Sequence, residues 1–431
     1  MNGQSRVLVV SYNSFSKENA NGRTLEFLVN SFEKQNLAQL FFSSEGPDFE
    51  YCDRYYRITE KNLLYALKKR TPVGRALVKS QDSFDGGVKN ATTTFGDRIS
   101  GFAKRNKTST FIKFLRNFLW KLTKPQWFNK SLQNWIAEFA PDVIFTISGK
   151  NSCFHYIALR IAKSYNLPLV VYHCEDYCYK NAYPNSLFYK AYIRGLKKSI
   201  DELMRYASLA IYNSDAIKSI YSEFHSTPHM VAYMSTDIHP VIKTHKEKEL
   251  IFSYMGNLGL GRDVSLCELA EALLQIEPLA KIQVFAPNVS DWFVQTAKDL
   301  PNIEYKGFIN YEECRAVMEQ SDVLIHTESF DEKIKQDLKI AFSTKIADSL
   351  ASGVPFFVYA PKGIASTDYL LKHGAACVAT SKEELQKKLA LFVEDDSLKD
   401  QYVTSALAIV KKNHTLQTTV KQIEERINGL L

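Results

Sequence analysis

The chain has 431 residues, of which 45% are apolar and 23% charged, a balance that excludes wholesale disorder. No run of about 18 apolar residues occurs, so we expect no transmembrane helix. Residues 1–250 carry 35 Lys and Arg against 22 Asp and Glu, a net charge of +13, whereas residues 251–431 carry 19 against 25, a net charge of −6. This split indicates two domains with different surfaces, of which the first suits an anionic partner.

The start of the chain and its cysteines favour a cytoplasmic protein. Only six residues precede the apolar run that begins at Val7, too few for a secretory signal. The seven cysteines are scattered and odd in number, as expected for reduced thiols. Cys174 and Cys178 form a close pair, and since no second pair matches them we expect no metal site.

Short β-branched runs alternate with longer amphipathic stretches in two successive series. The first series of expected strands covers residues 6–12, 38–42, 142–147, 167–173, 209–213 and 230–234. The second covers residues 250–255, 282–285, 322–326, 355–359 and 376–378. Helices are expected between the strands, among them residues 23–34, and a last helix at residues 416–431. This alternation predicts an α/β fold of doubly wound parallel sheets, whose ligands bind at the carboxyl ends of the strands.

The polar stretch at residues 238–249 separates the two series and has the composition of a linker. We therefore expect two Rossmann-like domains, residues 1–245 and 246–431, facing each other across a cleft, with the helix at 416–431 packing back on the first domain. One long sheet with insertions is the alternative arrangement. Residues 81–96 are rich in Gly, Ser and Thr, and we expect a mobile loop there.

Two strand ends of the first domain carry candidate acceptor-side residues. Gly22 and Arg23 follow the first strand, where free backbone N–H groups can approach an anion or a sugar, although a plain turn is the other interpretation. His173 and Glu175 lie at the end of the strand at 167–173. A histidine at a carboxyl strand end is expected to point toward the cleft, with a purely structural histidine as the alternative.

Residues 108–123 predict an amphipathic helix with an unusual charge balance. One face collects the apolar side chains Phe111, Ile112, Phe114, Leu115, Phe118, Leu119 and Leu122. The other face carries Lys113, Arg116, Asn117 and Lys121, with Trp120 among them. Residues 98–130 contain nine Lys or Arg and no Asp or Glu. The pattern is typical of an interfacial helix on an anionic bilayer, and an ordinary helix packed on the sheet is the alternative.

The second domain opens with a glycine-rich turn between a strand and a helix. Gly256, Gly259 and Gly261 allow the chain to pass close to a ligand, and Arg262 begins the following helix. Its guanidinium is expected to bind a diphosphate through two hydrogen bonds. A structural turn explains the glycines equally well.

A second candidate segment runs from Phe342 to Pro355. Ser343 or Thr344 is expected to cap a helix whose free N–H groups face a phosphate, and Lys345 adds a cation. Asp348, one turn later, is placed to accept hydrogen bonds from a ribose. A capped amphipathic helix with a solvated aspartate is the alternative.

Together these motifs resemble the GT-B glycosyltransferases, in particular the family-4-like bacterial enzymes of surface polysaccharide assembly. The family's Gly-Arg-Leu-x-x-x-Lys turn corresponds to Gly256-Asn257-Leu258-x-x-x-Arg262, with Asn257 in place of the arginine and Arg262 in place of the lysine. Gly307 and Phe308 match the family's Gly-aromatic turn beside the base. The run from Lys345 to Pro355 matches its Glu-Ala-x-x-x-Gly-x-Pro helix.

The sequence departs from that family at one carboxylate. The family usually has two glutamates separated by seven residues, of which the second corresponds to Asp348, while Ile340 stands at the first. The candidates for the missing carboxylate are Asp331, Glu332 and Asp337 in the preceding segment. The departure leaves the donor sugar and the stereochemical outcome open.

The resemblance implies transfer of a sugar from a nucleotide diphosphate sugar, expected to be a UDP-sugar, to a lipid-linked or polysaccharide acceptor at the inner face of a membrane. Arg262, Lys345 and the N–H groups near Ser343 and Thr344 are expected to stabilise the leaving diphosphate without a metal or cofactor, and His173 to orient the acceptor. No nucleic-acid partner is expected. A nucleotide-sugar 2-epimerase of the same fold and a non-enzymatic polyanion- or membrane-binding protein are the alternatives.

Overall fold

The computed structural model describes residues 4–15, 20–79, 110–179, 186–242 and 249–431. The chain forms two compact units, Met1–Ala232 with Val420–Leu431, and Tyr233–Thr419. The units therefore change at Ala232, whereas the charge and composition pattern placed the boundary at residue 245. The expected loop at 81–96 lies outside the described residues.

The first unit is built on an eight-stranded sheet in the order β4-β3-β2-β1-β5-β6-β7-β8. Neighbouring strands are parallel, except that β4 runs antiparallel to β3. The strands are β1 Val7–Ser11, β2 Leu37–Phe41, β3 Arg54–Arg57, β4 Arg75–Leu77, β5 Val143–Ile147, β6 Leu169–His173, β7 Leu209–Tyr212 and β8 His229–Val231. The central strands β1, β2 and β5 to β7 are buried along most of their length, as expected for a sheet covered on both faces.

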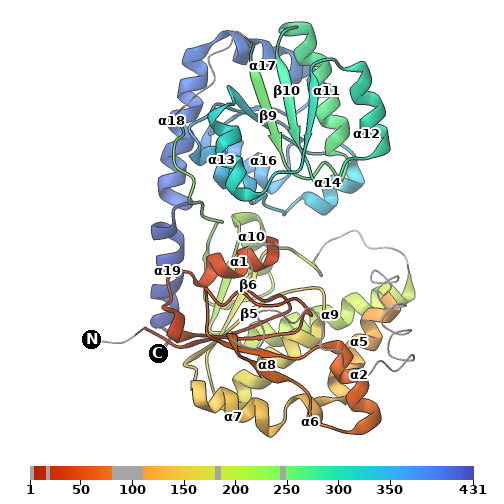
Figure 1. Cartoon of the computed structure of the whole chain (residues 1–431), viewed down its shortest axis with the longest axis vertical. Helices are drawn as coiled ribbons and strands as arrows, with labels where there is room; N and C mark the ends of the chain where they lie inside the picture. Colours follow the sequence, from red (N-terminus) through yellow and green to blue (C-terminus); the bar gives the residue numbers. More distant parts are fainter. Residues whose placement is uncertain (1–3, 16–19, 80–109, 180–185, 243–248) are drawn as a thin grey trace. The chain divides into compact units, whose positions relative to one another are not determined.

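Helices cover both faces of this sheet, with α1 on the face opposite α8 in Figure 1. The helical segments are α1 Ala20–Val29, η1 Lys34–Asn36, α2 Glu60–Lys69, α5 Thr110–Leu122, α6 Lys124–Trp127, α7 Lys130–Phe139, α8 Ser152–Tyr165, α9 Leu187–Tyr206 and α10 Asp215–Ser222. The last helix, α19 Leu416–Asn428, is tied to the start of the chain, because Glu424 accepts a 2.7 Å hydrogen bond from Gln4 and Asn428 one of 3.0 Å from the Ser5 N–H.

The second unit has a six-stranded, fully parallel sheet in the order β11-β10-β9-β12-β13-β14. Its strands are β9 Ile251–Met255, β10 Lys281–Phe285, β11 Ile303–Gly307, β12 Val323–Thr327, β13 Phe356–Tyr359 and β14 Cys377–Ala379. The chain winds outward from β9 to β11 and then returns to the middle at β12, so the strand order reverses between β9 and β12. Doubly wound sheets bind ligands at such a reversal.

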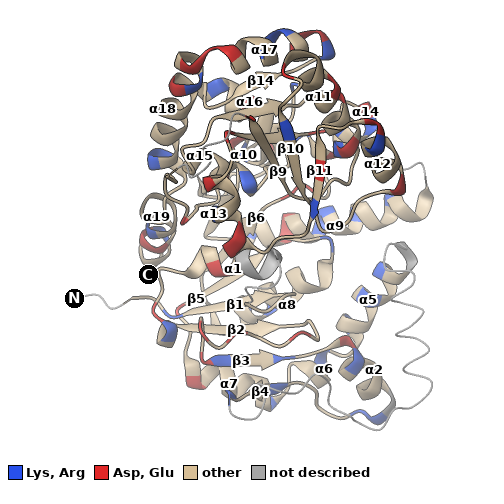
Figure 2. Cartoon of the chain, turned by 45° about the horizontal axis from the view of Figure 1, so that its top comes forward, with Lys and Arg blue, Asp and Glu red and all other residues tan. Residues whose placement is uncertain are grey.

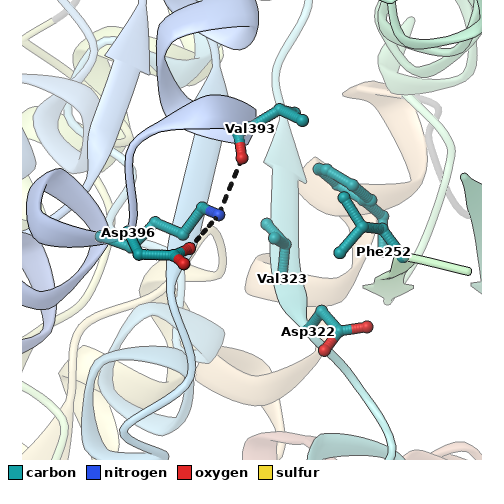
Figure 3. A pocket seen from close by; sticks show the side chains of 7 residues that line it. Phe252, Asp322, Val323, Val393 and Asp396 are labelled. Carbon is teal, nitrogen blue, oxygen red and sulfur yellow. Dashed lines mark hydrogen bonds and ion pairs between the residues drawn. The ribbon is translucent and has the colours of Figure 1, made fainter. Parts of the chain in front are cut away.

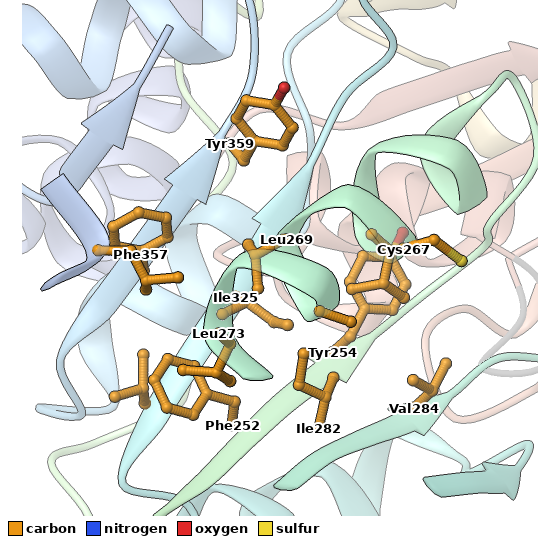
Figure 4. Packing of buried hydrophobic residues seen from close by; sticks show 14 of the residues in the cluster. Phe252, Tyr254, Cys267, Leu269, Leu273, Ile282, Val284, Ile325, Phe357 and Tyr359 are labelled. Atoms are coloured by element: carbon orange, nitrogen blue, oxygen red, sulfur yellow. The ribbon is translucent and has the colours of Figure 1, made fainter. Parts of the chain in front are cut away.

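The helices of the second unit pack in two groups. They are α11 Arg262–Ile276, α12 Asp291–Thr296, η2 Ala297–Asp299, α13 Tyr311–Glu319, α14 Glu332–Leu338, α15 Lys345–Ala351, α16 Ala365–His373, α17 Lys382–Glu394 and α18 Asp396–Asn413. One group pairs α11 with α17, and the other brings α15 and α16 against α18. Figure 4 shows Leu269 and Leu273 of α11 packed over Phe252, Ile282 and Phe357 of the sheet. This core fixes the carboxyl edge of the sheet, where the candidate site lies.

The two doubly wound parallel domains predicted from the sequence are confirmed. A GT-B fold consists of two Rossmann-like domains of this kind, and each compact unit has the expected topology.

Candidate functional site

The predicted residues of the second unit gather at the carboxyl edge of its sheet. Gly256 follows β9 and Glu328 follows β12, the two strands on either side of the reversal. Arg262 begins α11 and Lys345 begins α15. Segments far apart in the sequence thus meet at the place where an α/β sheet binds its ligand.

The turn after β9 requires glycine at two positions. Gly256 has φ +149°, and a Cβ there would overlap the ammonium of Lys345. Gly261 has φ +71°, and its Cβ would lie 2.6 Å from Ser329 Oγ. Both glycines therefore allow close approach of a neighbouring side chain to the backbone. Asn257 holds the turn itself, since its Oδ1 accepts a 2.7 Å hydrogen bond from the Gly259 N–H.

Arg262 is fixed by a carboxylate that the motif analysis did not single out. Its Nε donates to Glu328 Oε2 at 2.8 Å and its Nη2 to Glu328 Oε1 at 3.2 Å, a two-point ion pair. The side chain of Arg262 is 16% exposed and that of Glu328 only 4%. Burial opposes ionisation of Glu328, but His326 and the Arg262 guanidinium hold its pKa below the ordinary value. His326 Nε2 lies 3.1 Å from Glu328 Oε1.

Lys345 lies beside this ion pair with its ammonium against Gly256. Burial lowers the pKa of Lys345 to about 8, the positive charge of Arg262 lowers it too, and the negative charge of Glu328 opposes the change. Two cations and one anion are therefore concentrated at one strand end. A pair of cations of this kind suits a polyanionic ligand such as a diphosphate.

The expected helix cap before Lys345 is wrong. Thr344 has helical φ and ψ angles and makes no capping hydrogen bond through its side chain. The backbone N–H of Ser343 donates to Ser366 Oγ at 2.9 Å. The segment is already turning before α15 begins, so neither hydroxyl is placed to cap it.

Asp348 lies in the first turn of α15 beside Tyr311. The phenol of Tyr311 donates to Asp237 Oδ1 at 2.5 Å and lies 3.3 Å from Asp348 Oδ1. Burial, followed by the charges of Asp348 and Asp237, raises the pKa of Tyr311. The expected ribose contact of Asp348 remains a prediction, and Tyr311 is a neighbour that the sequence pattern did not indicate.

Gly307 and Phe308 end β11 at the same edge of the sheet. Gly307 has φ +84° and open space where a Cβ would be, and Phe308 is 68% exposed. An exposed aromatic ring at this edge offers a flat surface for a base. Its predicted role beside the base is not tested by the geometry alone.

Two of the three candidates for the missing carboxylate, Asp331 and Glu332, have local structural roles. Ile340 is buried. Asp331 caps α14 by accepting from the N–H groups of Lys333 and Ile334, and Glu332 pairs with Lys335 at 3.3 Å. The carboxylate found on Arg262 is Glu328. Its signal in the sequence was its place directly after the strand ending at Thr327.

The expectation that His173 faces an acceptor is wrong. Its side chain is 0% exposed, packed between Tyr221 and Tyr212, with Nε2 3.2 Å from Met204 Sδ. Burial lowers the pKa of His173 to about 3, with smaller contributions from the neighbouring histidines His155 and His225. The strand ends in the core, so the structural interpretation holds for this residue.

The other acceptor-side candidates are only partly described. Glu175 is exposed and lies after β6, beside the buried Asp176. Gly22 and Arg23 fall in the first turn of α1, and the side chain of Arg23 lies outside the described part of the chain.

Helix α5 forms as predicted, with much of its apolar face exposed, as the interfacial interpretation expects and the alternative of packing on the sheet does not. Phe114 and Phe118 are 64% and 56% exposed, and Leu115 and Leu122 are exposed beside them. Trp120 is fully buried, Arg116 pairs with Glu60 at 2.5 Å, and Asn117 accepts a hydrogen bond from the Cys153 N–H. The polar face packs on the fold, which leaves the apolar face outward. Figure 2 shows basic and no acidic residues on α5.

A pocket of about 110 Å³ lies at the opposite edge of the second sheet. It is lined at the amino ends of β9 and β12 by Phe252, Asp322 and Val323 (Figure 3). Lys399 crosses it to Asp396 Oδ1 at 2.7 Å and to the Val393 carbonyl at 2.9 Å. Its small volume and its distance from the strand reversal separate it from the candidate site.

Two broader properties bear on the kind of site. None of the helices in the described ranges has the length and hydrophobicity to cross a membrane. Within those same ranges, no group of three or more His, Cys, Asp and Glu side chains is arranged to hold a metal ion.

Comparison with known protein families gives a match that lies mainly in the second unit. Residues 264–425 match the family described as glycosyl transferase-like. Comparison with curated protein sequences gives no significant match. Residues 264–425 are thus similar in sequence to glycosyl transferases.

Solved structures of similar fold cover nearly the whole chain. HepE from Anabaena, in complex with UDP and glucose, is 14% identical with a TM-score of 0.59, over 98% of this chain and 99% of that one. Sucrose-phosphate synthase from Thermosynechococcus elongatus is 10% identical with a TM-score of 0.62, over 99% of each chain. A UDP-forming trehalose-phosphate synthase from Burkholderia vietnamiensis is 11% identical with a TM-score of 0.56, over 99% of this chain and 100% of that one. The whole chain therefore has the GT-B glycosyltransferase fold.

Proposed function

We propose that this protein transfers a sugar from a nucleotide diphosphate sugar, with a UDP-sugar as the first candidate, to a lipid-linked or glycan acceptor in cell-surface glycan synthesis. The observation that carries the proposal is the pair of cations, Arg262 and Lys345, at the strand reversal of a glycosyl transferase-like domain. The UDP complexes of HepE support the choice of donor.

The leaving diphosphate gains negative charge as the bond to the sugar breaks. Arg262 and Lys345 stabilise that charge, and they do so more strongly in the transition state than in the ground state. Guanidinium and ammonium groups thereby supply the electrostatic stabilisation that a metal ion supplies in other transferases, so the reaction needs no metal. Phe308 stacks on the base and Asp348 holds the ribose.

Calorimetric titration of nucleoside diphosphates tests the donor site. UDP should bind wild type. Arg262→Ala and Lys345→Ala should each lower kcat/KM, mainly through kcat, and the loss should correspond to about 2–4 kcal/mol of transition-state stabilisation. Lys281→Ala, at the amino end of β10, is the matched control and should bind UDP normally. Unchanged affinity and turnover in both Arg262→Ala and Lys345→Ala would refute the proposed site. Turnover of a UDP-sugar to its epimer without an acceptor would identify a 2-epimerase instead.

A membrane-bound acceptor is favoured by the surface of the first unit. Helix α5 carries an exposed apolar stripe, and its polar face contacts α9 through Lys113, whose ammonium lies 5.0 Å from the centre of the Tyr192 ring. Leu187 and Phe188, at the start of α9, are also exposed. Lys190, Arg194 and Lys198 form an exposed basic row along the same helix. Apolar side chains flanked by cations suit the interface of an anionic bilayer.

Sedimentation with lipid vesicles tests this peripheral binding at the cytoplasmic face. The protein should pellet with vesicles that contain phosphatidylglycerol at low salt, and binding should weaken as salt screens the cations. Vesicles of phosphatidylcholine alone are the control. Absence of binding to the anionic vesicles at low salt would exclude a membrane acceptor reached through α5.

A further inference from the structure

We propose that Glu328 is a positioning residue of the donor site, which holds the Arg262 guanidinium so that its outer N–H groups face the diphosphate. This inference rests on the proposed function. Glu328 was not among the carboxylates that the sequence motifs indicated, and it makes no diphosphate contact itself, since its charge repels one.

Glu328 is held by neighbours on three elements, α11, β12 and β13. Both oxygens are engaged by Arg262 of α11, and Oε1 also lies 3.1 Å from His326 Nε2 on β12. Its backbone is fixed as well, because the carbonyl accepts a 2.9 Å hydrogen bond from Ser265 Oγ and the N–H donates to the Tyr359 carbonyl at 3.1 Å. A carboxylate held in this way defines one plane and one orientation for the guanidinium.

The geometry of the pair leaves part of the guanidinium available. Nε and Nη2 face Glu328, so two of the five N–H groups are used. Nη1 makes a long contact of 3.4 Å with the Gly259 carbonyl. The edge formed by Nη1 and the second hydrogen of Nη2 can therefore still bind an anion through two hydrogen bonds.

The charges around the pair explain why the Glu328 carboxylate is tolerated in this buried position. Arg262 and Lys345 are both poorly exposed, and two adjacent cations without a counter-ion are destabilising in a buried site. The Glu328 carboxylate offsets that repulsion and favours the charged form of Lys345. The cations that act on it are Arg262 from α11 and Lys345 from α15, and the imidazole of His326 on β12 lies 3.1 Å from its Oε1.

Two substitutions separate the charge of Glu328 from its geometry. Glu328→Gln keeps the shape but removes the charge, and should lower turnover about 10- to 100-fold. It should also lower the alkaline midpoint, which is the pH at which UDP affinity is half lost as Lys345 gives up its proton, below the wild-type value. Glu328→Asp keeps the charge but is too short for the two-point pair, and should lower turnover while leaving that midpoint near its wild-type position. Glu268→Gln, on the same helix as Arg262 and bonded to Tyr359, is the control and should do neither.

A double substitution tests whether Glu328 acts through Arg262. Arg262→Ala combined with Glu328→Gln should be no slower than Arg262→Ala alone, because the arginine to be positioned is already gone. Additive losses, or an unchanged midpoint in Glu328→Gln, would overturn the inference. Thermal melting without ligand checks that the variants fold. If wild type binds no nucleoside diphosphate, the proposed function itself fails, whereas wild-type binding with an unaffected Glu328→Gln refutes only the positioning role.

Discussion

At the level of single residues, Lys345 gives the donor site a pH dependence. Its pKa of about 8 follows from burial beside Arg262. An ammonium binds a diphosphate and a neutral amine does not, so the charged form is present below pH 8 and is lost as the pH rises through that value. UDP affinity should be nearly constant below neutral pH and should fall by up to about tenfold per pH unit above pH 8.

Calorimetry between pH 6 and pH 9.5 checks this dependence. Lys345→Arg is the matched control, because a guanidinium stays charged over the whole range and the ligand's own titration affects both proteins equally. The wild-type profile should fall away from the Lys345→Arg profile above pH 8. Two parallel profiles would show that Lys345 does not contact the diphosphate as an ammonium.

The same residues show which parts of the site a sequence can predict. Gly256 and Lys345 could be placed together because Gly256 follows a strand and Lys345 begins a helix, both at the carboxyl edge of one parallel sheet. Glu328 was missed because its role depends on a partner in α11 that no local spacing links to it. His173 was misjudged for a related reason, since burial by Met204 and Tyr221 depends on elements distant in the sequence.

At the level of elements, α5 shows the limit of a helical wheel. The pattern at residues 108–123 correctly predicted a helix with two unlike faces, but it left open whether the apolar face meets a bilayer or packs on the sheet. Trp120 and the partner of Arg116 turn the polar face inward, which leaves the apolar face outward. Periodicity gives the two faces of a helix, and only the packed neighbours decide which of them is buried.

The outward apolar face and the packed polar face of α5 should respond differently to substitution. Phe114→Ser with Phe118→Ser should abolish binding to anionic vesicles and leave the free energy of unfolding nearly unchanged, since both rings are exposed. Arg116→Ala should keep vesicle binding but destabilise the first unit by about 1–3 kcal/mol, because it leaves the partly buried Glu60 unpaired. Urea denaturation and vesicle sedimentation measure the two effects. Retained vesicle binding in the double serine variant would contradict the outward orientation.

Strands were predicted where apolar residues are continuous and missed where they are not. The buried strands β1, β5 and β12 match the expected runs to within one or two residues. The strands β3, β4 and β11 lie at or near the edges of their sheets and carry charged residues such as Arg54 and Glu304, so their periodic signal is weak. Their positions depend on pairing with neighbours rather than on their own composition.

At the level of the whole molecule, the order of strands and helices predicted more of the fold than the sequence motifs did. Two series of alternating strands and helices predicted two doubly wound sheets, and right-handed crossovers then leave few possible topologies. The boundary between the units was harder to locate. The predicted linker was residues 238–249, yet the second unit already begins at Tyr233, which packs on Phe342 and Tyr369.

Buried neutral histidines in both units should make the protein sensitive to acid. Burial lowers the pKa to about 4 for His155 and about 3 for His173 in the first unit, and to about 4 for His414 in the second. An unfolded histidine titrates near 6.5, so between that pH and pH 4 the unfolded chain binds more protons than the folded one. Stability must therefore rise with pH across this window and be fully present above it. Each histidine should lower the free energy of unfolding by on the order of 2 kcal/mol at pH 5 relative to pH 8.

His173→Phe provides the sharpest test of this acid sensitivity. Phenylalanine fills the site between Tyr212 and Tyr221 but cannot take up a proton, so the variant should lose less stability than wild type when the pH falls from 7 to 5. Urea denaturation at pH 5, 6, 7 and 8, followed in each unit separately, gives the free energies. His414 is the contrasting case, because its Nε2 bonds to Tyr369 and its Nδ1 lies 2.8 Å from the Met234 carbonyl. His414→Phe should therefore destabilise the second unit at pH 8, and it should also reduce the loss of stability at acid pH. Identical pH dependence in His173→Phe and wild type would mean that His173 is protonated in the folded protein, and would return it to the accessible surface where an acceptor could meet it.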